Sequence, residues 1–147
     1  MPTNQERDQE RDQELFDELA FYTLTLHDPA FLHQNAVDAF AAQHVSAETK
    51  PITAVFALIG LYLTLEKGFS GRQVQLAHMR LARQRKQWPK IPPNSERASF
   101  SVADVLAAEP CAPREQAIRN WCTAVWETWA HQRPLIVQLA REELDVH

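Results

Sequence analysis

Two consecutive segments in the first half of the chain are apolar on nearly every side. Residues 29–45 carry one formal charge, at Asp38, and the segment that begins at Pro51 carries none before Glu66. At about 100° per residue, a helix through either segment has no charged face, which is the pattern of a buried helix. Asp28 is a good N-cap and proline is favoured at the first helical position, so we expect the first helix to begin directly after Asp28. The two segments predict a buried helical hairpin.

Amphipathic spacing and capping signals predict further helices around this hairpin. They cover residues 16–27, 70–88, 102–108 and 114–131, and Pro134 either kinks the last of these or starts a final helix. Gly68 is a good C-cap, Ser70 with Gln73 forms a capping box, and Ser101 caps the short helix. There is no strand-like alternation, and a chain with only three glycines and 45% hydrophobic residues favours helices over sheet. The predicted fold is all-α, a single-domain bundle of five to seven helices.

The beginning of the chain is polar and repetitive, with a Gln-Glu-Arg-Asp repeat in residues 5–14. Residues 1–19 contain seven acids and two arginines. Such a run is usually a solvated face, so we expect residues 1–14 to be a polar helical extension or a frayed tail. Residues 15–147 are then one helical domain.

The composition limits the expected cellular compartment and the classes of binding partner. Two cysteines, Cys111 and Cys122, provide neither a disulfide framework nor a paired metal motif, so a reducing cytoplasm is expected. No signal peptide or membrane-spanning run is present in the sequence, and no membrane association is expected. Residues 72–97 carry seven Lys or Arg and one Glu, which could contact phosphates or an acidic partner. The net charge of −4 argues against a nucleic-acid binder, and we favour a solvated face or a charge match with the acidic first helix.

The polar residues of the buried hairpin are the most informative, because a buried polar group needs a hydrogen-bond partner. Gln34 and Asp38 are four residues apart and can touch on one helix face. We interpret the polar residues as one network that locks helix register or contacts a small ligand or protein partner. Its predicted members are His33, Gln34, Asp38, Gln43, His44, Gln73 and Gln75.

A metal site is the alternative interpretation. If the hairpin is antiparallel, His27, His33, Glu66 and His78 could surround one point, with Asp38 one turn deeper. Imidazole and carboxylate suit a divalent transition metal such as zinc, iron, nickel or manganese, and helical bundles build such sites. The chain would then be a metal-dependent enzyme of the hydrolase or transferase type. Neither a His-x-x-x-His nor a Glu-x-x-His pair is present, so we prefer the hydrogen-bonded network.

The long helix near the end carries Trp121, Trp126 and Trp129. Steps of five and three residues place these rings on more than one helix face. One interpretation is that a tryptophan is exposed and marks a homodimer or protein-partner surface. The other, which we slightly favour, is that all three pack on the central hairpin. Cys122 occupies a core-like position in the same helix, so no nucleophile stands out.

The run HQNAVDAFAAQH from His33 to His44 resembles the H-x-x-x-V-D-A-Y-A-x-Q-H stretch of a family of small bacterial proteins of unknown function. Residues 58–68, LIGLYLTLEKG, and residues 71–79, GRQVQLAHM, extend the likeness over roughly residues 20–130. The chain lacks the cysteine-rich N-terminal segment of some members. The resemblance implies no activity. It implies that the family is recognised by His33, Asp38, Gln43, His44, Glu66 and His78.

Overall fold

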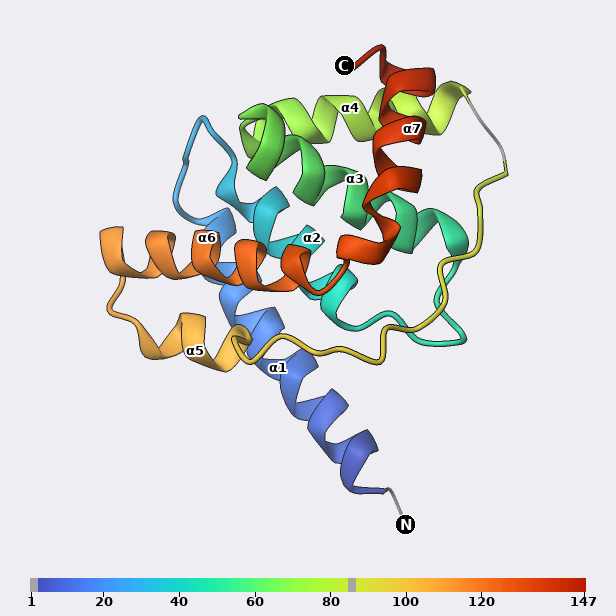
Figure 1. The fold of residues 1–147 in the computed structure, drawn as a ribbon. Helices are drawn as coiled ribbons and strands as arrows, with labels where there is room; N and C mark the ends of the chain where they lie inside the picture. Colours follow the sequence, from blue (N-terminus) through green and yellow to red (C-terminus); the bar gives the residue numbers. More distant parts are fainter. Residues whose placement is uncertain (1–2, 85–86) are drawn as a thin grey trace.

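A computed structural model describes residues 3–84 and 87–147 and consists of helices and loops (Figure 1). Over these residues it contains seven α-helices, one 3₁₀ helix and no strand, which confirms the predicted all-α bundle. The elements are α1 (Asn4–Leu24), α2 (Leu32–Gln43), α3 (Pro51–Lys67), α4 (Gly71–Gln84), α5 (Val102–Ala107), α6 (Ala112–Glu127), η1 (Ala130–Gln132) and α7 (Arg133–Leu144).

The predicted central hairpin is confirmed, with α2 and α3 at the middle of the bundle (Figure 1). Helix α2 contacts α1, α3, α4 and α6, and α3 also contacts α6 and α7. Asn35 of α2 meets Thr64 of α3, and Asp38, one turn later, meets Gly60, one turn earlier. The two helices are therefore antiparallel. Their apolar surfaces are covered on several sides, as helices without a charged face require.

Helix α2 begins at Leu32 and not at Pro29, which corrects the predicted start by three residues. Phe31 has a φ of 58°, in the left-handed region, so the helix cannot extend back through it. The Asp28 carboxylate accepts hydrogen bonds from the backbone N–H groups of Ala30 and Leu32, each at 2.8 Å. Asp28 therefore caps a turn that precedes the helix, which is a common use of aspartate before proline.

Helices α3 and α4 begin and end largely as their capping signals predict. Gly68 ends α3 with a φ of 71°, a backbone conformation that glycine adopts without strain. The backbone N–H of Ser70 donates to Gln73 Oε1, and the Ser70 hydroxyl accepts from the backbone N–H of Gln73. Of the predicted continuation to residue 88, Arg85 and Lys86 lie outside the described residues, and Gln87 and Trp88 are not helical.

The remaining boundaries differ from prediction by a few residues or settle an open alternative. Helix α1 ends at Leu24, three residues before the predicted end, and α6 ends at Glu127. A separate α7 follows from Arg133, with Pro134 in its first turn, so the proline starts a helix instead of kinking one.

The first turns of α1 project from the bundle (Figure 1). Residues 4–14 form one continuous helix with residues 15–24, and nearly all of these first residues are exposed. Thr3 caps the helix by accepting from the backbone N–H of Glu6 at 3.1 Å. None of the helices in residues 3–84 and 87–147 is long and apolar enough to cross a membrane.

Candidate functional site

Three of the predicted polar residues meet between α2, α3 and α4. Gln34 Nε2 donates to Asp38 Oδ1 at 3.0 Å and also lies 3.5 Å from His78 Nδ1. His78 Nε2 donates to the Phe56 carbonyl oxygen at 2.8 Å. Because the amide nitrogen of Gln34 carries two hydrogens, it can serve the carboxylate and the ring together. The contacts form one chain from α3 through α4 to α2.

Asp38 is buried, with 2% of its surface exposed, as the apolar pattern predicts. Its Oδ2 atom has no hydrogen-bond partner among the described residues and lies against Gly60, where an added Cβ would be 1.9 Å away. Burial raises the pKa of Asp38 well above its usual value, and the Gln34 hydrogen bond offsets only part of this effect. Burial also lowers the pKa of His78. The structure thus disfavours charge on both groups.

Gln43 and His44 lie apart from this chain and join other helices to α2. Gln43 Oε1 accepts from the Trp121 indole N–H at 2.8 Å, and its Nε2 donates to the Phe100 carbonyl at 2.9 Å. His44 Nε2 lies 3.0 Å from Asp12 Oδ2 on α1. Each of these two side chains hydrogen-bonds to partners of its own. The predicted polar residues therefore form several separate contacts instead of one network.

Gln73 and Gln75 also lie apart from the buried cluster. Gln73 binds the backbone of Ser70, and Gln75 accepts from the Arg72 guanidinium within the same helix. Gln73 precedes His78 by five residues, which turns it about 140° away around the helix axis. Gln73 therefore caps the start of α4, and Gln75 forms a contact within the first turns of the same helix.

Glu66 points away from the histidines with which it was expected to share a metal ion. It accepts from the Trp126 indole N–H at 2.8 Å and from the Arg133 guanidinium, whose Nε lies 2.9 Å from Oε2. These hydrogen bonds, that to Arg133 first, lower the pKa of Glu66. Thr64 faces Asn35 of α2, and two further residues turn the chain by about 200°. Glu66 therefore faces α6 and α7.

The three histidines of the predicted metal site are also separated from one another. His27 is exposed in the turn after α1, where its φ is 51°. His33 Nδ1 lies 2.8 Å from the Thr23 hydroxyl, and burial lowers the pKa of His33. His78 is engaged with Phe56 and Gln34. Across residues 3–84 and 87–147, no three His, Cys, Asp or Glu side chains are grouped so that they could hold a metal ion. The predicted ligand set is not assembled.

The three tryptophans at which one interpretation placed a partner surface are all buried. Trp121, Trp126 and Trp129 are 0%, 9% and 1% exposed. The indole N–H of each donates to an oxygen atom on α2 or α3. Burying an indole favours such a partner for its N–H group. All three rings therefore pack on the central hairpin, as the favoured interpretation predicts, and they hold α6 and the start of η1 against it.

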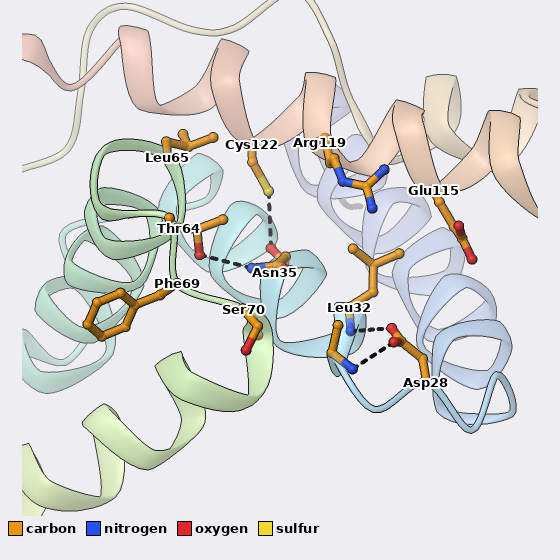
Figure 2. A pocket seen from close by; sticks show the side chains of 13 residues that line it. Asp28, Leu32, Asn35, Thr64, Leu65, Phe69, Ser70, Glu115, Arg119 and Cys122 are labelled. Carbon is orange, nitrogen blue, oxygen red and sulfur yellow. Dashed lines mark hydrogen bonds between the residues drawn. The ribbon is translucent and has the colours of Figure 1, made fainter.

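An open cleft of about 360 Å³ lies where α2 and α4 begin, α3 ends and α6 passes (Figure 2). We call it the α2–α6 cleft. Its apolar lining includes Leu32, Leu65 and Phe69. Gly71 allows the start of α4 to approach the loop before α2, because an added Cβ would lie 1.9 Å from the Phe31 carbonyl oxygen. A side chain at Gly71 would displace one wall of the cleft.

Three polar side chains form the floor of the α2–α6 cleft (Figure 2). Asn35 Nδ2 donates to the Thr64 hydroxyl oxygen at 3.0 Å, and the Cys122 thiol donates to the backbone carbonyl oxygen of Asn35 at 3.5 Å. Burial is the main reason that the pKa of Cys122 lies far above its usual value. A thiol that stays protonated is a poor nucleophile. The floor is therefore suited to hydrogen bonding and not to covalent chemistry at sulfur.

The rim of the cleft is charged. Arg119 is exposed on α6 and Glu115 lies one turn before it, and both side chains reach the cleft (Figure 2). Asp28 also lines the rim, but its carboxylate is held by backbone N–H groups. Arg119 and Glu115 are thus the charged groups best placed to meet a bound molecule.

The residues of the α2–α6 cleft are not among the site residues predicted from the sequence. Asn35 is 8% exposed on a mostly apolar helix and, like its neighbours Gln34 and Asp38, needs a hydrogen-bond partner there. That signal could have selected Asn35. No comparable pattern marks Thr64 or Arg119, because each is an ordinary residue of its helix until the helices come together.

The fold and the cleft define an all-helical protein with a hydrogen-bonded core hairpin and a small open cleft at one end of it. The chain belongs to DUF5946, a family of unknown function, whose pattern matches residues 8–130. This confirms the resemblance to an uncharacterised family. No curated protein and no solved structure matches the chain.

Proposed function

We propose that this protein is a binding module that holds a small organic carboxylate in the α2–α6 cleft. The observation that supports this most directly is the convergence of polar groups from three helices, α2, α3 and α6, in a cavity of about 360 Å³ that is open to solvent. Small-molecule sites commonly have volumes of about 300–1,000 Å³ and combine an apolar lining with a few polar groups. The α2–α6 cleft has both properties.

Arg119 is the residue that would bind the carboxylate group of the ligand. A guanidinium presents a planar set of donors that matches a carboxylate in a bidentate pair, and Arg119 is exposed at the mouth of the cleft. The start of α4 also lines the cavity and adds the partial positive charge of a helix N-terminus. Glu115, one turn from Arg119, favours a ligand that also carries a hydrogen-bond donor or a cationic amine.

The body of the ligand would lie between the polar floor and the apolar wall. Leu65 and Phe69 offer apolar contact, and Asn35 with Thr64 offers hydrogen bonds at the inner end. A small amino acid or hydroxy acid has this combination of groups. The protonated thiol of Cys122 and the absence of a nearby base bonded to it favour binding over catalysis among the described residues.

The proposal is tested by measuring thermal unfolding of the full chain with a panel of amino acids and hydroxy acids at neutral pH. A ligand present at 100 times its Kd stabilises the fold by about 2.7 kcal/mol, which raises Tm by roughly 5–10 °C for a chain of this size. We expect at least one carboxylate to give such a shift, and Arg119→Ala to abolish it.

Arg141→Ala is the matched control, because Arg141 is exposed on α7 and does not line the cleft. The control should keep the full Tm shift. A panel in which no carboxylate raises Tm, or a shift that survives Arg119→Ala, would remove the support for this function.

A further inference from the structure

Helix α4 carries an outward stripe of arginine and apolar side chains. Arg72, Leu76, Met79 and Arg83 are four, three and four residues apart, which places them within about 60° of one another. Leu76 and Met79 are 56% and 48% exposed. Val74, Ala77 and Leu81, on the other side of the helix, are buried. We call the outward set the α4 stripe.

Helix α1 carries an outward stripe of the opposite charge. Glu10, Asp17, Phe21 and Leu24 also fall within about 60° of one another, opposite the buried Leu19. Phe21 and Leu24 are 75% and 56% exposed. Together with Leu76 and Met79 they are four of the five large apolar side chains exposed in the described part of the chain. We call this set the α1 stripe.

The two stripes meet at a corner of the surface. A hollow of about 350 Å³ is lined by Leu24 from the α1 stripe, Arg72 from the α4 stripe, and Phe31 between them. The Arg72 guanidinium lies 4.7 Å from the centre of the Phe31 ring. Helix α1 runs toward this corner and α4 runs away from it (Figure 1). The hollow and the two stripes that start from it, as its two arms, make up one candidate surface.

We propose that this surface joins two copies of the chain in a two-fold symmetric dimer. The α1 stripe of each copy lies antiparallel on the α4 stripe of its partner. A two-fold axis that bisects the corner exchanges the two arms, so each copy contributes the same surface, as an isologous interface requires. Because α1 approaches the corner and α4 leaves it, the exchange makes the paired helices antiparallel.

The residue spacing fits this arrangement. From the corner outward, Leu76, Met79 and Arg83 are separated by three and four residues. The partner's Leu24, the partner's Phe21 and the partner's Asp17 are separated by the same steps. Leu76 then meets the partner's Leu24, Met79 meets the partner's Phe21, and Arg83 meets the partner's Asp17.

The chemistry of the stripes selects a second copy as the occupant. Exposed apolar side chains grouped in this way usually mark an interaction surface. The α4 stripe is cationic and the α1 stripe is anionic, so each complements the other stripe and repels its own kind. Both stripes face outward within one chain, so α1 cannot lie on its own α4.

The dimer is tested by light scattering coupled to size-exclusion chromatography, on the full chain and on two charge-reversed variants. The wild type should have twice the chain mass of 16.9 kDa at micromolar concentration. Arg83→Glu and Asp17→Arg should each weaken dimerisation at least tenfold, because each places two like charges in contact at both symmetric sites. Both residues are exposed, so circular dichroism should show unchanged helix content.

Mixing the two variants provides the decisive measurement. In a mixed dimer, the introduced glutamate on α4 of one copy would face the introduced arginine on α1 of the other, and the native Arg–Asp pair would form at the second site. An equimolar mixture of Arg83→Glu and Asp17→Arg should therefore regain wild-type dimerisation. Arg141→Glu, on α7, is the control that should leave the dimer unchanged. A monomeric wild type, or a mixture that dimerises no better than its components, would overturn the proposal.

Discussion

Helix α2 presents two polar side chains to α3, one turn apart, and they have opposite surroundings. Asp38 lies against Gly60, accepts a hydrogen bond from Gln34, and is only 2% exposed. Asn35 bonds Thr64 at the same helix interface but lines an open cleft. The difference shows that a polar side chain in a helical hairpin stabilises the fold where neighbouring segments bury it. It is available to bind a ligand where they leave it open to solvent. At Asp38 the helices are in close contact, whereas at Asn35 α3 ends and the chain turns away.

The largest loss of stability is expected from a substitution that fills the space now occupied by the Asp38 carboxylate. In Gly60→Ala the new Cβ would lie 1.9 Å from Asp38 Oδ2 and 2.6 Å from its Cγ, so α2 and α3 must move apart. Overpacking a core usually costs about 1–3 kcal/mol, and this overlap with a buried carboxylate should cost about 3 kcal/mol or more. The free energy of unfolding in urea measures it.

A double-mutant cycle distinguishes this clash from a general effect of the substitution on α3. In an Asp38→Ala background, Gly60→Ala meets no carboxylate and should cost less than about 1 kcal/mol, because the two positions are directly coupled. Equal costs in both backgrounds would show that Asp38 does not lie against Gly60.

An intermediate effect should appear in the pH dependence of stability. Burial raises the folded-state pKa of Asp38 above its value in the unfolded chain, about 3.9. Between those two values the native state binds more protons than the unfolded state, so this group lowers stability as pH rises. Asp38→Asn removes that titration. Relative to wild type, the variant should gain stability above about pH 4, by at most about 1.4 kcal/mol per pH unit.

Urea unfolding of both proteins at several pH values between about 4 and 8 measures this difference directly, and the comparison cancels the other titrating groups. Asp8→Asn, at an exposed position on α1, is the matched control for loss of one carboxylate. If the free energies of unfolding of Asp38→Asn and wild type vary with pH in parallel, Asp38 does not lie in a buried site that disfavours its charged form.

The smallest effect on stability is expected in the cleft. Arg119→Ala removes an exposed side chain from α6, so the free energy of unfolding should change by less than about 0.5 kcal/mol. The same substitution is expected to abolish carboxylate binding. If the free energy of unfolding fell by several kcal/mol, Arg119 would be part of the packing. The contrast between the buried Asp38 site and the open cleft would then fail.

The buried contact between Gln34 and Asp38 could be predicted from the sequence, but the α2–α6 cleft and the positions of the other polar residues could not. The burial of Asp38 and the contact between Gln34 and Asp38 follow from helical spacing alone. The expected meeting of Glu66 with the histidines failed, because an antiparallel hairpin fixes the level of a residue along the axis but not the direction in which it points. At Glu66 the packing of α3 against α6 and α7 decided that direction.

The sequence by itself determined the helices, most of their ends and the buried central hairpin, because these depend on local properties. Apolar periodicity selects the buried segments, and Gly68, Ser70 and Gln73 act on backbone groups within a few residues. Only the tertiary structure decided the inward packing of the tryptophans, the α2–α6 cleft and the corner where α1 meets α4. Each depends on how helices distant in sequence cross and rotate against one another, and that geometry is set by the packing of many side chains at once.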